Sequence, residues 1–431
     1  MNLQKYLGFL LIGFTTCQLA FGQDTLQLNR QQCEALFLKE NLLLIAEKLN
    51  INQAEATLRQ ARLWPNPTLT IDQVNAWATP AQLQGAEGLP PLVGRFGRNQ
   101  QIGVEIEQLL LTAGKRKKMM AVEQVSVDMA GQYFEELLRN LKVEFRKDLT
   151  QLQYLQQLRE VYRKQLSSVQ QLVNAYRKQV EEGNLSKAEW LRLKALELEI
   201  VQEIHGLSKE MNNIQHELKV LMNLPPSSCL VLDTTGYLPE FAKIKRLAPD
   251  SLLQEATTHR PDLKIAQLEK KYFDKWHTYE RAQRIPDITL KAGYDRGGNF
   301  MKDFVGFGVG IDLPVFNRNQ GNIKHARIAM ERAEVLGAQK ALEMESGLLL
   351  ANQHLQTAIA FYERLEPGFE AELDRMLNRF TKTFKDRDIS QLEYLDFLEA
   401  YLNNKKNLLE SSKEINLKLE ELQYEVGTDI L

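Results

Sequence analysis

Apolar residues recur at alternating intervals of four and three positions along two long segments of the chain. In residues 115–182, which contain one glycine and no proline, the recurring residues are Tyr162, Leu166, Val169, Val173, Tyr176 and Val180. This spacing is typical of the seam of a coiled coil. An uninterrupted helix over these residues would be roughly 100 Å long. The pattern therefore predicts a very long helix, followed by a return helix that ends at Pro225-Pro226.

A second stretch of helical pattern runs from about residue 321 to residue 425. It is interrupted only by Pro367-Gly368 and by a polar turn near Asp386-Arg387-Asp388. Proline and such turn residues mark helix boundaries. We therefore expect a second long helical hairpin over these residues.

Between the helices the apolar period changes from about 3.6 to 2. Four segments, at about 67–76, 101–110, 286–296 and 303–314, alternate apolar residues with Gly, Thr or charged residues. Each is predicted to be a strand with one apolar face, as strands against lipid have. The alternative is a small sheet of a soluble protein with these strands exposed to solvent.

The same order of elements occurs twice along the chain, which indicates a duplication. At an offset of 221, Pro65 falls on Pro286, and at an offset of 204, Glu189 falls on Glu393. We predict a first repeat over 23–222 with its helical hairpin at 114–222, a linker over 223–251, and a second repeat over 252–431 with its hairpin at 321–425. The fold class is mainly α with a small β part, as a duplicated unit of helix, two strands and long helical hairpin.

Four strands are too few to close a barrel, and open sheet edges are not tolerated in lipid. If the strands span a membrane, several chains must contribute strands to one barrel. Two chains would give about eight strands and a filled interior, whereas three would give about twelve and leave a lumen. Aromatic residues near the predicted loop ends suit a membrane interface: Trp77, Tyr294, Phe300 and Phe304.

The first 22 residues are predicted to be a secretory signal peptide. Lys5 precedes the apolar run Tyr6–Phe14, and Ala20-Phe21-Gly22 offers small residues where a signal peptidase cleaves. Cys17 leaves lipidation as an alternative, although Phe14-Thr15-Thr16 fits the lipidation signal poorly. We predict no disulfide between the remaining cysteines, Cys33 and Cys229.

Composition and motifs argue against several other classes of protein. The chain has 54 Lys and Arg against 56 Asp and Glu, so it lacks the basic excess of a nucleic-acid-binding protein. Residues 306–310 (Gly-Phe-Gly-Val-Gly) lie inside an alternating strand pattern, which is the wrong context for a phosphate-binding loop. The six histidines are scattered. We therefore expect no enzyme activity, no resident metal and no cofactor.

The sequence resembles the TolC-type outer-membrane efflux proteins over about residues 30–425. The resemblance rests on the duplicated architecture and on the local patterns at residues 62–67, 259–263, 313–321, 182–186 and 387–390. It implies a homotrimer in outer-membrane lipid, with a twelve-stranded barrel continued by a periplasmic α-helical barrel. It also implies two partners, a periplasmic adaptor protein and an inner-membrane pump of the proton-driven resistance-nodulation-division type.

In that family the two hairpin turns form the periplasmic tip that meets the adaptor. By resemblance, the docking residues are Gly183, Asn184, Leu185, Ser186, Glu189, Leu191, Asp388, Ile389, Ser390, Glu393, Leu395 and Asp396. Ser186 and Ser390 are also expected to cap the return helices, with Glu189 and Glu393 completing capping boxes. Asp388, Glu393 and Asp396 are candidates for a charged ring at the channel entrance, unless they are only part of a solvated helix surface.

The first turn, with Glu189-Trp190-Leu191 after Asn184-Leu185-Ser186, looks like the branch that works with cobalt-zinc-cadmium pumps. This likeness favours metal cations as the cargo, while drug efflux and type I protein secretion stay open. The alternative from a different class is a periplasmic coiled-coil scaffold without a channel. Fractionation with the outer membrane distinguishes the two classes.

Overall fold

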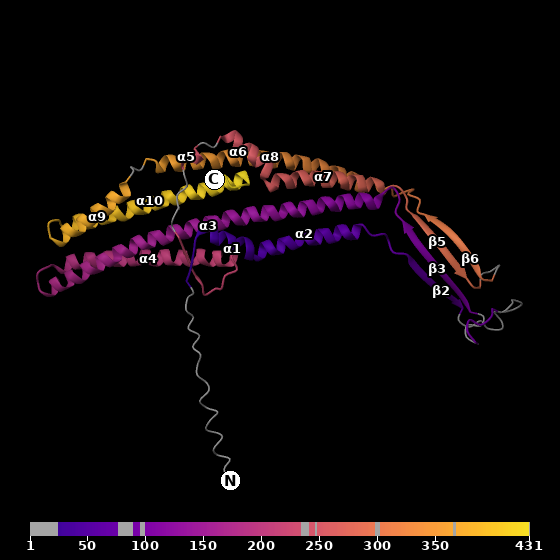
Figure 1. The fold of residues 1–431 in the computed structure, drawn as a ribbon, viewed down its shortest axis with the longest axis horizontal. Coiled ribbons are helices and arrows are strands. Elements are labelled where there is room, and N and C mark those ends of the chain that lie inside the picture. Colours follow the sequence, from indigo (N-terminus) through magenta and orange to yellow (C-terminus); the bar gives the residue numbers. More distant parts are fainter. Residues whose placement is uncertain are drawn as a thin grey trace, which may run out of the picture. The chain divides into compact units, whose positions relative to one another are not determined.

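A computed structural model describes residues 25–75, 89–94, 100–233, 241–245, 248–297, 302–364 and 368–430 of the chain. The predicted signal peptide, Cys17, Trp77 and Phe300 lie outside the described residues. The described helices and strands, labelled in Figure 1, are β1 (Thr25–Leu28), α1 (Arg30–Glu40), α2 (Leu42–Ala61), β2 (Thr68–Asn75), β3 (Gln101–Leu110), α3 (Lys115–Glu181), α4 (Lys187–Leu221), β4 (Cys229–Leu232), α5 (Phe241–Ile244), α6 (Pro249–His259), α7 (Pro261–Ala282), β5 (Ile288–Asp295), β6 (Phe304–Ile311), α8 (Gln320–Tyr362), α9 (Phe369–Lys385) and α10 (Gln391–Val426).

The chain forms two compact units, and each takes segments from both predicted repeats. The first unit comprises Met1–Ile45, Arg139–Leu252 and Leu348–Leu431, and the second comprises Ala46–Leu138 and Leu253–Gly347. The helices α2, α3 and α8 each begin in one unit and end in the other. The division into two repeats along the sequence therefore remains an interpretation of the sequence pattern.

The second unit contains a four-stranded antiparallel sheet in the order β2-β3-β5-β6. Each strand lies inside its predicted range. The two predicted strand pairs meet between β3 and β5, where Leu110 pairs with Ile288 and Gly103 with Asp295. Strands β2 and β6 form the two outer positions of the sheet.

The first unit is built on two helical hairpins, α3–α4 and α9–α10. The predicted seam of α3 lies partly inside, since Tyr162, Val169 and Val173 are buried. Towards α1 the core contains a stacked pair, Phe37 and Phe145, with ring centroids 4.6 Å apart. No helix within the described residues has both the length and the apolar composition needed to cross a bilayer.

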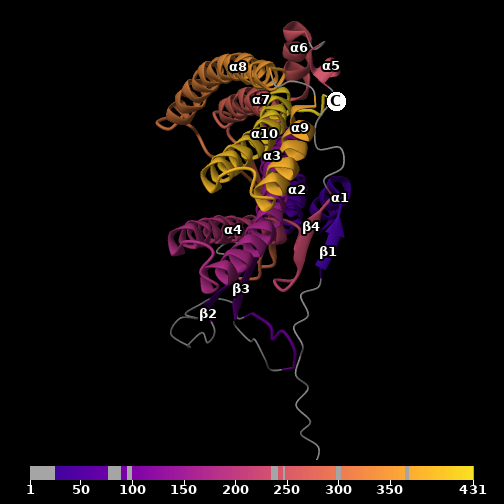
Figure 2. The same cartoon turned by 90° about the vertical axis from the view of Figure 1, so that its left-hand side faces the viewer.

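The segment predicted as a linker, 223–251, contains regular structure that the sequence analysis missed. β4 pairs in parallel with β1, with Thr25 opposite Cys229, and Figure 2 shows the two strands side by side. The side chain of Gln156 makes two hydrogen bonds to the backbone of β4. Its side-chain amide N–H donates to the Leu230 carbonyl at 3.1 Å, and its side-chain carbonyl accepts from the Leu232 N–H at 3.1 Å. The short strand Cys-Leu-Val-Leu is thus fixed to the α3 helix.

Asp148 on α3 gives the first unit a specific pH dependence. Burial, together with Glu217 and Glu144, raises the pKa of this carboxyl to about 7. An unfolded aspartate titrates near pH ~3.9, so the folded state holds the proton more tightly and stability falls as pH rises from about 4 to 7. We expect Asp148→Asn to raise the unfolding temperature at pH 8 by about 3 °C and to change it little at pH 4.

Thermal unfolding followed by circular dichroism at the two pH values measures this effect. The exposed aspartate Asp388, changed to Asn, is the control. Equal shifts for Asp148→Asn at pH 4 and pH 8 would contradict the prediction.

Candidate functional site

The first hairpin turn, between α3 and α4, is closed by backbone hydrogen bonds around Gly183. Gly183 has φ of 78°, a left-handed conformation that glycine adopts without strain. The Asn184 N–H donates to the Gln179 carbonyl at 2.8 Å, and the Gly183 N–H donates to the Val180 carbonyl at 3.1 Å. Ser186 then caps α4, and Glu189 completes the capping box.

The second hairpin turn, between α9 and α10, has the same geometry without the glycine. Arg387 takes the place of Gly183 with φ of 65°. The Asp388 N–H donates to the Thr383 carbonyl at 3.0 Å, as Asn184 does to Gln179. Ser390 and Glu393 form the second capping box. The N–H and the hydroxyl of Ser390, both donating to the carboxylate, lower the pKa of Glu393.

The two turns lie against each other, at the same end of their hairpins (Figure 1). The Gln391 amide donates to the Glu189 carbonyl at 2.7 Å, and the Arg387 guanidinium donates to the Gln179 side chain at 3.3 Å. Behind them Phe384 stacks between Tyr176 and Tyr394, with centroid distances of 5.7 and 4.5 Å. The structure therefore brings the twelve predicted tip residues to one surface, which we call the double tip.

Most residues of the double tip are open to solvent. Its exposed members are Gly183, Asn184, Ser186, Leu191, Asp388, Ser390, Glu393 and Asp396, and its half-buried members are Leu185, Glu189, Ile389 and Leu395. Leu185 and Ile389 occupy equivalent positions just before the two caps. The surface thus combines a pair of matched aliphatic side chains with helix N-termini and acidic groups.

The three candidates for an entrance ring differ in whether their carboxylates already accept hydrogen bonds from the protein. Glu393 is engaged by Ser390, with a Ser390 N–H contact of 2.8 Å. Asp388 and Asp396 are exposed and make no ion pair with any residue that the structure describes. Asp388 and Asp396 are therefore the better candidates to face an approaching ion.

Sequence reasoning missed several residues that shape the double tip. Gln391 joins the two turns, and Trp190 lies directly after Glu189. The Trp190 indole N–H and the Gln391 side-chain carbonyl are buried and have no hydrogen-bond partner within the described part of the chain. Buried polar groups are nearly always paired, so a water or another molecule is expected to pair with them. No sequence pattern marks these two atoms as unpaired.

The difference between Gly183 and Arg387 leads to a test of the turns. A Cβ at residue 183 would meet no atom within 4 Å, so the cost of Gly183→Ala comes only from its positive φ. We expect the change to destabilise the first turn by about 1 kcal/mol. Amide hydrogen exchange at Asn184 and Leu185 should then be about fivefold faster.

Arg387→Gly is the matched change at the second turn. It should slow exchange at Asp388 or leave it unchanged, because the strain that it relieves offsets the loss of the contact with Gln179. Faster exchange at Asp388 in this variant would contradict the assignment of strain to the backbone.

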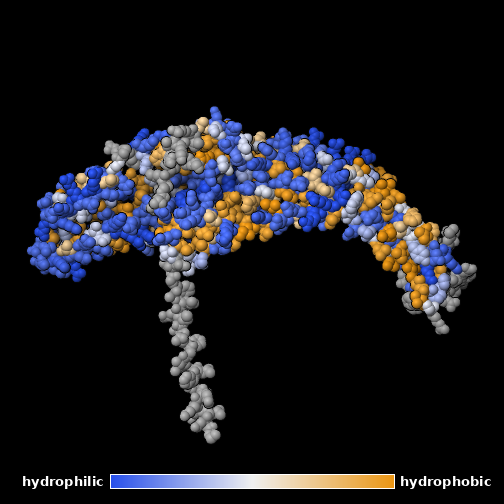
Figure 3. Space-filling model, in the orientation of Figure 1, coloured by the Kyte–Doolittle hydropathy of each residue, from blue (hydrophilic) through white to orange (hydrophobic). Residues whose placement is uncertain are grey.

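The sheet of the second unit has one continuous apolar face. The apolar residues that share this face by register are Leu69, Ile71, Ile102, Val104, Ile106, Leu110, Ile288, Leu290, Ala292, Tyr294, Val305, Phe307, Val309 and Ile311, and Gln108 is on the same face opposite Leu290. Ile71 is 65% exposed and Phe307 is 86% exposed, and Figure 3 shows apolar side chains over the strands. An apolar face of this extent is unusual for a surface in contact with water.

The opposite face of the sheet is polar and carries charge. Thr70 lies opposite Glu105, and Glu107 lies opposite Lys291. Lys291 forms ion pairs with Glu107 and, at 3.2 Å, with Glu105. On β6 this face consists of Phe304, Gly306, Gly308 and Gly310, and Gly308 lies opposite Lys291. Neither β2 nor β6 has a second strand partner among the described residues.

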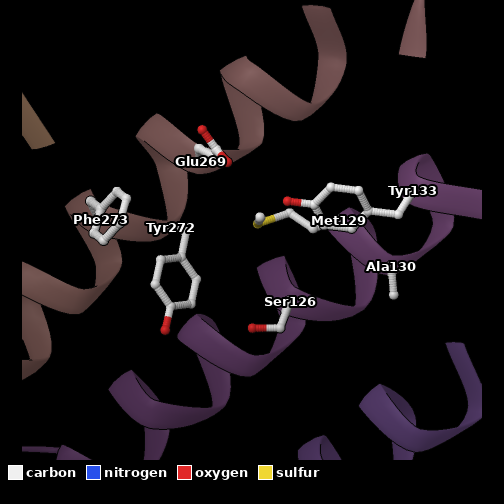
Figure 4. Close-up of a pocket in the computed structure, with 7 residues that line it drawn as sticks. All are labelled: Ser126, Met129, Ala130, Tyr133, Glu269, Tyr272 and Phe273. Carbon is white, nitrogen blue, oxygen red and sulfur yellow. The ribbon is translucent and has the colours of Figure 1, made fainter. Parts of the chain in front are cut away.

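A cleft of about 370 Å³ lies between α3 and α7 of the second unit (Figure 4). Its lining residues are Ser126, Met129, Ala130, Tyr133, Glu269, Tyr272 and Phe273. Burial, and to a lesser extent Glu269, raises the pKa of Tyr133. The lining offers no pair of acid and base, and no group of three His, Cys, Asp or Glu among the described residues is placed to hold a metal ion.

Comparison with known proteins finds similarities to outer-membrane proteins. Residues 35–224 match the family described as Outer membrane efflux protein. The chain is 23% identical over 223 residues to the cobalt-zinc-cadmium resistance protein CzcC of Cupriavidus metallidurans, an alignment that covers 52% of this chain. That alignment spans about half of the relative's own length, 51%.

Two further similarities extend over most of the chain. The probable outer membrane lipoprotein SilC of Salmonella typhimurium is 22% identical over 425 residues, which cover 90% of this chain and 84% of the relative. The crystal structure of the Campylobacter jejuni CmeC outer membrane channel superimposes with a TM-score of 0.72 at 13% identity, and covers 92% of this chain and 85% of the other. At this identity the structural likeness concerns the fold.

Proposed function

We propose that this chain, whose residues 35–224 match the outer membrane efflux protein family, is the outer-membrane channel of a tripartite efflux system. It conducts solutes passively from a periplasmic adaptor and an inner-membrane pump to the exterior. The channel has no chemistry of its own, and the partner pump supplies the energy. The observation that carries the proposal is a four-stranded sheet with an exposed apolar face, a polar opposite face and two unpaired outer strands.

Three copies of the chain complete the barrel. The outer strands β2 and β6 leave backbone N–H and C=O groups without a strand partner in the described part of the chain. Such groups are not stable in lipid. Twelve strands from three chains pair every outer strand and leave a lumen, whereas eight strands from two chains would fill the interior with side chains. The apolar face then contacts lipid, and the face with Glu105, Glu107 and Lys291 lines the water-filled lumen.

The double tip is the docking surface for the adaptor. It combines the exposed residue Leu191 with the half-buried Leu185 and Ile389 on two adjacent turns. The pump is of the proton-driven resistance-nodulation-division type, as the resemblance to TolC-type efflux proteins implies. Rings of Asp388 and Asp396, repeated by threefold symmetry, would set the charge of the entrance.

Metal cations are the favoured cargo. The relative CzcC is named for resistance to cobalt, zinc and cadmium. The exposed carboxylates of Asp388 and Asp396 at the proposed entrance suit cations, and an open channel needs no coordinating cluster. Growth of a deletion strain with and without the protein, on graded cobalt, zinc and cadmium salts, tests the cargo.

The mass of the detergent-purified protein, measured by light scattering with the detergent subtracted, tests the channel. A mass near three chains, together with recovery in the outer-membrane fraction, supports the proposal. A monomer that is recovered outside the membrane fraction would overturn it and leave a periplasmic scaffold.

A further inference from the structure

Four connections between helix and strand lie at one end of the sheet. The register places Thr68 opposite Glu107, Leu110 opposite Ile288, and Ile288 opposite Ile311. The start of β2, the end of β3, the start of β5 and the end of β6 therefore share this end, and Figure 1 shows α2, α3, α7 and α8 meeting the sheet there. We call the connecting residues 59–66, 111–118, 281–287 and 312–320 the junction belt.

The junction belt is strongly basic in a chain that is nearly neutral. It contains nine Lys and Arg but only two Asp, whereas the whole chain has a net charge of -2. One of the two acidic residues, Asp287, is already paired with Lys115 at 2.8 Å. Arg62, Lys117, Arg284 and Arg318 are exposed, and none has an acidic partner in the part of the chain that the structure describes.

The first turn of α3 carries positive side chains at the positive end of the helix dipole. Lys115, Arg116, Lys117 and Lys118 begin the helix, and the first turn has no acidic residue. Basic side chains at a helix N-terminus are unfavourable, whereas an anion there is stabilised by the dipole and by the free N–H groups. Asp287 supplies one carboxylate at this helix end, through Lys115 and the Thr112 N–H, which leaves the exposed Lys117 without an acidic partner among the described residues.

Large apolar side chains alternate with these basic residues. Trp64 is 55% exposed and Phe316 is 93% exposed, and Leu63, Ile285 and Leu313 are exposed as well. Each lies within a few residues of a Lys or Arg of the junction belt. Adjacent aromatic and basic side chains are characteristic of the boundary between lipid and water.

A cleft at the junction belt is lined by both apolar and basic side chains. It has a volume of about 270 Å³, and its lining includes Leu63, Trp64, Leu111, Arg116, Met119 and Tyr279. The Arg116 guanidinium lies over the Trp64 ring, 4.1 Å from its centroid, and donates to the Arg62 carbonyl at 2.8 Å. The cleft therefore has apolar walls beside a guanidinium whose position is fixed.

We infer that the junction belt binds the headgroups of anionic phospholipids in the periplasmic leaflet of the outer membrane. The inference rests on the proposed function, because it places the sheet in the bilayer. The phosphates contact the basic residues, and the glycerol and upper acyl segments contact Trp64 and its apolar neighbours. Each Lys or Arg that lies near an anionic lipid surface strengthens binding to that surface about fivefold. The same side chain in contact with water alone has no such gain.

The test is native mass spectrometry of the delipidated trimer titrated with phosphatidylglycerol or with phosphatidylcholine of the same acyl chains. We expect the wild-type protein to bind the anionic lipid at least about fivefold more tightly. The variant Arg62→Gln, Lys117→Gln, Arg284→Gln, Arg318→Gln should lose this preference. Its affinity for phosphatidylcholine should stay the same.

A control variant removes four exposed basic residues away from the belt: Arg163→Gln, Lys209→Gln, Arg332→Gln and Lys406→Gln. It should keep the wild-type preference for the anionic lipid. A belt variant that keeps the charge, with Arg62→Lys, Arg284→Lys, Arg318→Lys and Lys117→Arg, should keep it as well. Equal binding of the two lipids by the wild-type protein, or the same loss in the control variant, would overturn the inference. Membrane fractionation of each variant separates this failure from failure of the proposed channel, because a protein that inserts without a lipid preference refutes only the inference.

Discussion

Replacing both Leu185 and Ile389 with Asp is expected to reduce export to the level of cells that lack the protein, while trimers remain in the outer membrane. The two residues occupy equivalent, half-buried positions on the double tip. Desolvating an unpaired carboxylate at a partner surface costs several kcal/mol, by the cost of burying unpaired charge. Two such groups per chain would remove the adaptor without changing the sheet. Metal tolerance and the amount of outer-membrane trimer measure the two effects.

A matched control introduces the same charges a short distance away. Asn174 and Asn378 are exposed residues at equivalent positions of the two hairpins. Asn174→Asp with Asn378→Asp changes charge without changing shape, and should leave export intact. Loss of export in this control would mean that charge alone blocks the system. Normal export in the Leu185 and Ile389 variant would remove the docking assignment.

Ile71→Arg is expected to prevent stable insertion of the sheet, whereas Thr70→Arg at the neighbouring position should be tolerated. Ile71 lies on the apolar face opposite Val104, and Thr70 lies on the polar face opposite Glu105. Arginine on the lipid face of a barrel costs about 2–4 kcal/mol at mid-depth, three times over in a trimer. On the polar face the same arginine would lie near a carboxylate and in water.

Comparing the outer-membrane yield of trimer for the two variants measures the difference. A yield of Ile71→Arg below about a tenth of the yield of Thr70→Arg is expected, because 1.4 kcal/mol already corresponds to tenfold. Equal yields would show that the apolar face does not contact lipid, and would favour the soluble scaffold.

The sequence pattern predicted the regular elements because their signals are local. The spacing of Tyr162, Val169 and Val173 predicted α3, and the alternation around Phe307 predicted β6. The capping boxes at Ser186 and Ser390 were also predictable, since each depends on residues three positions apart. These signals need no knowledge of distant contacts.

Features that depend on distant contacts could not be predicted. β1 and β4 are four residues each, too short for a periodic signal, and they are defined only by pairing with each other. Arg387 gives no sign of its left-handed backbone, because glycine is the usual residue there. The contact between Gln391 and Glu189 depends on how two hairpins pack side by side. The docking role of the double tip came from family resemblance and stays a proposal.

The parallel pairing of β1 with β4 imposes an order on the assembly of the chain. Thr25 precedes the whole first hairpin, and its partner Cys229 follows it. Closing so long a loop is slow compared with forming a helical hairpin. Strand β1 therefore stays unpaired until the α3–α4 hairpin has formed. Pairing of β1 with β4 is then a late folding step, which takes place only after the first hairpin has formed.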